Sequence, residues 1–402
     1  MITLPDIQQA RETISAYVHR TPLIHSSSLS ILSGAEVYLK LENLQKTGSF
    51  KVRGAFNKLT RIAEHRVIAA SMGNHAQAVA YAAGKLGKQS TIVMPETASI
   101  IKQEATRGYG ADVVLHGEKF NDALDHALSR KNAVFIHPFD DDAVIAGQGT
   151  TGLEIIEDLK DIGAVLVPVG GGGLIAGIAV AVKALSPETH VIGVQAAAAA
   201  SACASFGEHR VCERIPGNTI ADGIAVGKVG ERTLALIGRH VETMLTVSED
   251  SIARAILLFL ERKKLVVEGA GAVPLAALLE NKERFRGKRV VLVVSGGNID
   301  FTLIDRIILK GLMTSGRLGV FAVVIDDIAG SLHTVTGIIG SHKANILSVA
   351  HDRATGDVEI GKAKVVFTVE VRSREHLASV LAALRERGYE VRSEAASPAE
   401  LS

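Results

Sequence analysis

Short runs of β-branched apolar residues alternate with amphipathic helical stretches from about residue 35 to residue 310. This alternation is typical of parallel α/β sheets, because strands buried on both faces are joined there by crossover helices. No other feature of the chain limits the possible folds as strongly. It predicts strands at Val67–Ser71, Thr91–Met94, Val113–Leu115, Val165–Val169, Val191–Gln195 and Val290–Val294.

Three of the predicted strands end directly in segments rich in glycine or asparagine. These segments are residues 71–74 (Ser-Met-Gly-Asn), 169–171 (Val-Gly-Gly) and 295–298 (Ser-Gly-Gly-Asn). In open α/β sheets, ligands bind at the carboxyl ends of the strands. We therefore expect these segments to line a ligand site.

The longest glycine run is Gly170, Gly171, Gly172 and Gly173, which lies between the apolar run Ala164–Val169 and the helical pattern Leu174–Leu185. Without Cβ atoms, four amides can point into one concavity. The helix start adds unpaired N–H groups and about half a positive charge. The loop predicts a phosphate-monoester site. The alternative for an isolated run is a flexible turn, and no Gly-Lys-Ser or Gly-Lys-Thr follows to indicate a nucleotide site.

Composition excludes several classes of partner. The 44 lysines and arginines nearly balance the 43 aspartates and glutamates, so we expect no nucleic-acid polymer and no membrane as partner. Cys203 and Cys212 are the only cysteines, which disfavours a disulfide framework and a structural zinc. The chain shows no targeting segment and no run of about 18 apolar residues. We expect a cytoplasmic protein, with two or three domains for 402 residues.

Lys51 on its own would most often be a solvated lysine. Its context, however, includes Ser-Phe-Lys-x-Arg-Gly at 49–54, Ser-Met-Gly-Asn-His at 71–75, the glycine run at 170–173 and Ser-Gly-Gly-Asn at 295–298. In order and approximate spacing these motifs resemble the fold-type II pyridoxal-phosphate enzymes. That resemblance implies an α/β fold with two open twisted sheets. Within this group, residues 5–312 resemble the threonine dehydratases.

The resemblance implies the cofactor pyridoxal 5'-phosphate and a small amino-acid substrate. Lys51 would bond covalently to the cofactor aldehyde and, once released, act as the base at the substrate Cα, in keeping with amine chemistry. The implied cofactor-binding residues are Phe50, Lys51, Asn74, Gly170, Gly171, Gly172, Gly173, Leu174, Glu268 and Ser295. The implied substrate-binding residues are Ser71, Met72, Gly73, Asn74 and His75, through main-chain N–H groups that face the carboxylate.

Individual roles follow from the same resemblance. Phe50 covers the cofactor ring, Asn74 contacts its hydroxyl, Ser295 meets the pyridine nitrogen and Glu268 lies beside the ring. A neutral serine at that nitrogen makes the ring a milder electron sink and favours elimination. The implied reaction is the deamination of L-threonine to 2-oxobutanoate and ammonia, and of L-serine to pyruvate.

Other functions remain possible at this stage. A serine racemase or another β-hydroxy amino acid dehydratase of the same fold is the main alternative, followed by a β-replacement synthase. A non-catalytic amino-acid sensor is disfavoured by Lys51. Racemisation requires a proton carrier on each face of Cα. In serine racemases the second carrier is a serine directly before Gly-Asn-His, where this chain has Met72, which has no transferable proton. The Ser71 side chain is expected to point the other way.

No metal site is expected. Asp140, Asp141 and Asp142 run consecutively, which is typical of a solvated loop. Related serine racemases bind a divalent ion through acids just after the strand that corresponds to Val191–Gln195, but residues 195–201 contain no carboxylate. His75 is a candidate general base, and a packing or hydrogen-bonding role is the alternative.

A second unit begins after the connector at residues 311–318. Alternating apolar residues predict strands at 320–324, 346–351 and 365–371, and helical patterns separate them in the order βαββαβ. Residues 317–395 resemble an ACT domain, a ferredoxin-like module that binds amino acids between paired copies. Gly330 permits close backbone approach at a helix start.

The expected domain organisation follows from these boundaries. Residues 1–48 and 149–312 form a large cofactor-binding domain, residues 49–148 form a small catalytic domain, and residues 317–395 form a regulatory domain. The resemblance implies an amino-acid or nucleotide effector and a homodimer or homotetramer. A dimerisation module that binds nothing is the alternative for the C-terminal part.

Overall fold

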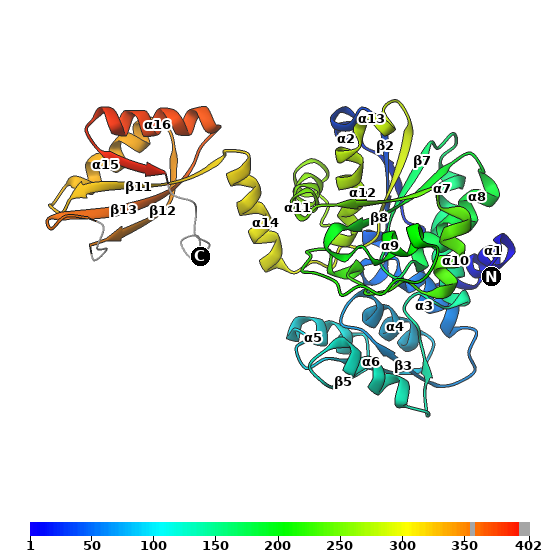
Figure 1. Cartoon of the computed structure of the whole chain (residues 1–402). Helices are drawn as coiled ribbons and strands as arrows, with labels where there is room; N and C mark the ends of the chain where they lie inside the picture. The colour runs from blue at the N-terminus through cyan, green and yellow to red at the C-terminus, as the bar shows by residue number, and fades with distance from the viewer. Residues whose placement is uncertain (354–357, 394–402) are drawn as a thin grey trace. The chain divides into compact units, whose positions relative to one another are not determined.

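The computed structural model describes residues 1–353 and 358–393, and the chain divides into two compact units, Met1–Asp300 and Phe301–Ser402 (Figure 1). The helices of the first unit are α1 Leu4–Ile14, α2 Ser27–Ser33, α3 Lys51–Leu59, α4 Asn74–Lys85, α5 Ile100–Gly108, α6 Phe120–Ser129, α7 Asp142–Asp158, α8 Gly173–Leu185, α9 Ser201–Glu208, α10 Glu231–His240, α11 Glu249–Leu258, α12 Gly269–Glu280 and α13 Lys282–Phe285. Its strands are β1 Leu23–His25, β2 Glu36–Leu41, β3 Arg66–Ala70, β4 Gln89–Met94, β5 Asp112–Leu115, β6 Val134–Phe135, β7 Ala164–Pro168, β8 His190–Ala196, β9 Thr243–Val247 and β10 Arg289–Val294. Short helices are η1 Glu42–Leu44, η2 Lys46–Gly48, η3 Ala197–Ala199, η4 Asp222–Ile224 and η5 Phe259–Lys263.

Two separate sheets organise the first unit. One is six-stranded in the order β1-β2-β10-β7-β8-β9, and the other is four-stranded in the order β5-β4-β3-β6. All pairings are parallel except that of β1 with β2. The α/β fold with two sheets is therefore confirmed, and each of the six predicted strands exists with ends within two residues of the expected ones.

The six-stranded sheet joins the two ends of this unit. Strand β2 pairs with β10 along its whole length, from Glu36 opposite Arg289 to Leu41 opposite Val294. The strands are continuous apolar runs because helices cover them, and β7 and β10 are almost wholly buried. As a result, the residue that follows β10, Ser295, lies beside the segment that leads from β2 towards Lys51.

Helix α3 packs on both halves of the first unit. Its apolar side chains Val52, Phe56 and Leu59 belong to the core of the four-stranded sheet, and the Phe56 ring stacks on Tyr17 with 4.7 Å between centroids. The helix also packs against α7. Lys51, its first residue, is thus held on a rigid element rather than on a loop.

The second unit contains α14 Phe301–Thr314, β11 Leu318–Asp326, α15 Ser331–Ser341, β12 Asn345–Asp352, β13 Lys362–Glu370, α16 Arg374–Glu386 and β14 Glu390–Ser393. Its sheet has the order β12-β13-β11-β14 with antiparallel pairings, so the βαββαβ prediction is confirmed. Gly330 precedes α15 with φ of 95°, a left-handed conformation that favours glycine. Residues 354–357 and 394–395 of the expected regulatory domain lie outside the described residues.

Within the described ranges, no helix combines the length and apolar character that crossing a membrane requires.

Candidate active site

Lys51 occupies the N-terminus of α3, directly after Phe50. Its Nζ donates a hydrogen bond to the carbonyl oxygen of Pro138 at 3.1 Å and lies 5.1 Å from the centre of the Phe50 ring. Burial lowers the pKa of the Lys51 amine to about 8, although the Glu268 carboxylate acts in the opposite direction. A substantial fraction of this amine is therefore neutral near pH 8, the form that can attack a carbonyl carbon.

The lysine segment and the segment after β10 hold each other in place. The Phe50 N–H donates to the Ser295 carbonyl at 3.1 Å, and the Gly297 N–H donates to the Gly48 carbonyl at 2.9 Å. Ser49 and Gly296 form an antiparallel bridge between these two hydrogen bonds. Lys51 and Ser295 are consequently brought together, although 244 positions separate them in the sequence. Ser295 is buried.

The glycine run forms a tight cradle at the start of α8. Gly172 has φ of 94° and is the N-cap of the helix. A Cβ on Gly171 would lie 2.3 Å from the Phe139 ring, and a Cβ on Gly172 would lie 2.9 Å from Thr233. The Ala176 N–H makes the first bond of the helix, to the Gly172 carbonyl. The amides before it point out of the helix end and suit an anion.

A short segment connects the lysine to the glycine cradle. Pro138 accepts the Lys51 hydrogen bond, and the next residue, Phe139, packs against Gly171 and Gly173. No signal in the sequence indicated this segment, because a carbonyl acceptor can be supplied by any residue type. Its position depends on the tertiary fold alone.

The three consecutive aspartates are not a solvated loop, and that interpretation of the sequence is wrong. Asp140 Oδ1 accepts hydrogen bonds from the first amides of α10, Arg232 at 3.0 Å and Thr233 at 3.1 Å. Asp141 caps α7 by accepting from Ala143 and Val144, and also pairs with Lys58. Asp142 pairs with Arg232. The carboxylates satisfy helix N-termini that lie next to the glycine cradle.

Asn74 and Glu268 form a pair between the two sheets. The Asn74 Nδ2 donates to Glu268 Oε1 at 2.9 Å and Oε2 at 3.0 Å, and its Oδ1 accepts from Asn298 Nδ2 at 2.7 Å. Burial raises the pKa of Glu268 to about 7, while the Asn74 hydrogen bonds act to lower it. Asn298, which orients Asn74, was part of a sequence motif but was not among the predicted site residues.

The segment Ser71–His75 leads from β3 into α4. The Ser71 N–H donates to the Val93 carbonyl at 3.2 Å, and the Ser71 hydroxyl accepts from the Gly73 N–H at 3.2 Å. Met72 is 37% exposed. His75 is buried with Nε2 bonded to the Ile136 carbonyl at 2.9 Å, and burial lowers its pKa to about 3. His75 is thus a neutral, hydrogen-bonded packing residue.

The residues fit pyridoxal phosphate. The cradle leaves no room for a Cβ at Gly171, its amides suit a phosphate, and the nearby Lys51 amine is largely desolvated. A metal has no comparable arrangement: the part of the chain described here holds no cluster of three His, Cys, Asp or Glu side chains around one point. The Gln195 side chain is occupied by the Val169 carbonyl at 3.0 Å and the Cys203 N–H at 2.9 Å.

Known proteins share this sequence and fold. The chain is 50% identical over 400 residues to an L-threonine ammonia-lyase of Thermotoga maritima, covering 98% of this chain and 99% of the relative. A threonine deaminase structure, from a source given as T.th., is 45% identical with a TM-score of 0.72, covering 75% of this chain and 99% of that one. A serine racemase structure from Dictyostelium discoideum is 37% identical with a TM-score of 0.70, covering 75% of this chain and 99% of that one.

The family assignment extends across most of the first unit. Residues 14–296 match the family described as pyridoxal-phosphate dependent enzyme. This range contains Lys51, Asn74, the glycine cradle, Glu268 and Ser295. The chain therefore belongs to the pyridoxal-phosphate-dependent enzyme family.

Proposed function

We propose that this enzyme removes water from L-threonine and releases 2-oxobutanoate and ammonia, with L-serine giving pyruvate in the same way. The observation that carries the proposal is the buried Lys51 amine, whose pKa is lowered to about 8, on the loop paired with Ser295. The 50% identity to an L-threonine ammonia-lyase over nearly the whole chain supports threonine as the substrate.

The bound cofactor supplies an electron sink for the pair left when Cα loses its proton. Gly170, Gly171, Gly172, Gly173 and Leu174 hold its phosphate at the start of α8. Phe50 covers the ring from the lysine side. Ser295 meets the pyridine nitrogen, and Asn74 contacts the ring hydroxyl while Glu268 and Asn298 hold its amide in one orientation.

The protein's own groups then handle the substrate. Main-chain N–H groups at the start of α4, from Gly73 to His75, bind the substrate carboxylate, and Lys51 takes the proton from Cα. The β-hydroxyl leaves as water, and hydrolysis of the remaining enamine consumes one water and gives the 2-oxo acid and ammonia. Atoms balance because the water that is lost is regained in the last step.

A racemase is the second candidate, because the serine racemase from Dictyostelium discoideum is 37% identical to this chain. The described geometry disfavours it. Position 72 carries a methionine, and the neighbouring Ser71 hydroxyl already accepts the Gly73 N–H at 3.2 Å. The face of Cα opposite Lys51 therefore lacks a proton carrier.

Incubation with L-serine is expected to give pyruvate, with D-serine forming at less than about one hundredth of that rate. The physical reason is that the thioether of Met72 cannot return a proton to the second face of Cα. Chiral chromatography and a 2-oxo acid assay on the same samples measure both products. The variant Met72→Ser should gain D-serine formation. Comparable rates of the two products in the unmodified enzyme would contradict the dehydratase assignment.

The C-terminal unit acts as the regulatory part in this proposal, binding an amino-acid or nucleotide effector. Its ferredoxin-like sheet order and the left-handed Gly330 at the start of α15 support it, because a helix N-terminus with an unhindered backbone suits a carboxylate or phosphate. The division into residues 1–48 with 149–312, residues 49–148 and residues 317–395 belongs to the same proposal. So do a cytoplasmic location and a homodimer or homotetramer.

An effector is expected to change the initial rate of the full-length enzyme by about fivefold or more. Isoleucine, valine, serine and a nucleotide are the compounds to titrate. Gly330→Ala strains a backbone with φ of 95° and should weaken the response while the basal rate stays the same. Gly337→Ala is the matched control, since it places a methyl group in open space on α15 without a positive φ. No response to any of the four compounds would favour a module that only pairs subunits.

A further inference from the structure

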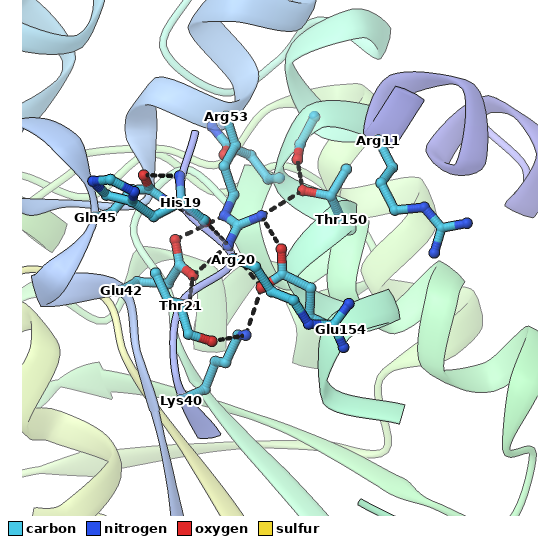
Figure 2. A network of polar contacts seen from close by, with 12 residues as sticks. Arg11, His19, Arg20, Thr21, Lys40, Glu42, Gln45, Arg53, Thr150 and Glu154 are labelled. Carbon is cyan, nitrogen blue, oxygen red and sulfur yellow. Dashed lines mark hydrogen bonds and ion pairs between the residues drawn. The ribbon is translucent and has the colours of Figure 1, made fainter. Parts of the chain in front are cut away.

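A network of buried charges lies behind the lysine helix (Figure 2). We call its members Lys40, Glu42, Arg53 and Glu154 the buried quartet. Each of these residues is at most 5% exposed. Two cations and two anions cancel, so the quartet carries no net charge. None of the four is assigned to the cofactor or the substrate, which leaves the purpose of so much buried charge to be explained.

Arg53 is at the centre of the quartet. Its Nε and Nη2 donate to the two oxygens of Glu42, both at 2.8 Å. Nη1 and Nη2 donate to the two oxygens of Glu154 at 2.7 and 2.9 Å, and Nη1 also reaches Thr150 Oγ1 at 3.0 Å. Two carboxylates therefore grip a planar guanidinium along two edges, which restricts its rotation as well as its position.

Lys40 completes the charge balance. Its Nζ donates to Glu154 Oε2 and to the Thr21 carbonyl at 2.7 Å. Burial would push the pKa of Glu42 upward, but Arg53 and Lys40 outweigh burial and hold that pKa below its usual range. The carboxylates that grip Arg53 therefore remain charged under ordinary conditions.

The quartet joins segments that each lead to the active site. Arg53 follows Lys51 by two positions on α3, and this spacing puts the two side chains on nearly opposite sides of the helix. Lys40 and Glu42 flank Leu41, which pairs with Val294, the residue before Ser295. Movement of Arg53 relative to β2 would therefore move the Lys51 amine relative to Ser295.

The third segment is α7, which carries Glu154 and Thr150. This helix begins at Asp142, shortly after Pro138, whose carbonyl accepts the Lys51 hydrogen bond, and Phe139, which packs on the glycine cradle. One guanidinium is thus bonded to the elements that carry the lysine, the pyridine-nitrogen serine and the wall of the phosphate cradle.

Stability alone is a poor explanation for this arrangement. Buried ion networks lose much of their attraction to desolvation, and apolar residues of similar volume often replace them without loss of stability. Helix α3 already packs through Val52, Phe56 and Leu59 into an apolar core. Apolar packing tolerates small shifts, whereas a bidentate fork held from two sides defines one geometry.

We propose that Arg53 is a positioning residue, which fixes α3 against β2 and α7 and so holds the Lys51 amine in register with the Ser295 loop. The inference rests on the proposed role of Lys51. It concerns alignment within the site, and it predicts that the quartet affects turnover and the Lys51 amine more than it affects substrate affinity.

Arg53→Lys keeps the charge and removes the fork, and Arg20→Lys is the matched control. Arg20 is also an arginine bonded to two carboxylates of α7, Glu157 and Asp158, but its side chain is 51% exposed. In the holoenzyme we expect Arg53→Lys to lower kcat by about tenfold or more with KM changed less than about threefold. Arg20→Lys should leave both constants unchanged.

A second readout does not depend on turnover. Apoprotein is mixed with pyridoxal phosphate across pH 6.5 to about 10.5, the adduct is trapped with borohydride, and the peptide that contains residue 51 is quantified by mass spectrometry. In Arg53→Lys the pH midpoint for attachment should rise towards that of an ordinary lysine, because a looser helix lets water reach the amine. An unchanged midpoint together with unchanged kcat overturns the proposal, even if the melting temperature falls.

If Arg53→Lys does not fold, Thr150→Val tests the same idea while leaving all four charges in place. It removes the 3.0 Å hydrogen bond to Nη1, and a smaller fall in kcat with the same upward shift in midpoint is expected. Thr151→Val is its control, since the neighbouring hydroxyl is buried on the same helix without a recorded partner. Equal behaviour of the two variants would overturn the proposal. Turnover retained by Lys51→Ala would instead overturn the proposed function.

Discussion

Lys51→Ala is expected to lower dehydratase turnover by more than about a thousandfold. The substitution removes both the amine that bonds to the cofactor and the base that takes the Cα proton. The fold should survive, because Lys51 is the first residue of α3 and the helix packs through Val52, Phe56 and Leu59. The measurements are 2-oxo acid release from L-threonine, absorbance in the range where a lysine-bound cofactor absorbs, and thermal unfolding.

The control for this experiment is Lys131→Ala, which changes an exposed lysine. Its turnover and visible absorbance should match those of the unmodified enzyme. Turnover by Lys51→Ala above about one tenth of the normal rate would rule out Lys51 as the essential amine. It would also remove the basis for assigning Ser295 and the glycine cradle to one cofactor.

Gly172→Ala is expected to weaken cofactor binding by roughly tenfold or more, since about 1.4 kcal/mol corresponds to a factor of ten. Two effects act together. The φ of 94° costs a residue with a Cβ about 1–2 kcal/mol, and the new methyl group would lie 2.9 Å from Thr233 and Ile237. The amides at the start of α8 must therefore shift away from the position in which they converge on a phosphate.

Equilibrium titration of apoprotein with pyridoxal phosphate measures this change, and inorganic phosphate competition reports on the cradle separately. Gly207→Ala is the control, since a methyl group there meets no atom within 4 Å and the backbone has no positive φ. Cofactor affinity equal to that of the control would show that the glycine run is a turn and not the phosphate site.

Local sequence predicted the elements well where one physical cause dominated. The strands β3, β7 and β10 are continuous apolar runs because both faces of a parallel sheet are buried. Strand β3 ends at Ala70, one residue before the expected end, since Ser71 already belongs to the turn into α4. The βαββαβ order of the C-terminal unit followed from periodicity in the same way.

Partners distant in the chain could not be predicted from such patterns. Asn74 and Glu268 are 194 positions apart, and neither residue type specifies the other. The pairing of β2 with β10, which brings Ser295 beside the lysine loop, depends on which strands the sheet places next to each other. Parallel pairing through crossovers leaves no local signal of strand order.

The aspartates at 140–142 show the limit most clearly. Consecutive carboxylates are usually solvated, and their sequence contains nothing that identifies the two helix N-termini that they cap. Arg53 shows the same limit, because a charged residue in an amphipathic helix is normally exposed, yet here it is 1% exposed. Its two carboxylate partners come from different elements, η1 directly after β2 and the helix α7.

The sequence by itself determined which elements form and which residue types can do chemistry: the apolar strands, the glycine run before α8, and a lysine followed by an arginine two positions later. These depend on backbone sterics and on the period of side chains, which are local properties. Only the tertiary structure decided how these residues meet. Burial of Lys51 and Glu268, which moves the pKa values of both groups towards neutrality, arises when two sheets close around them, because desolvation depends on every atom nearby and not on neighbours in the chain.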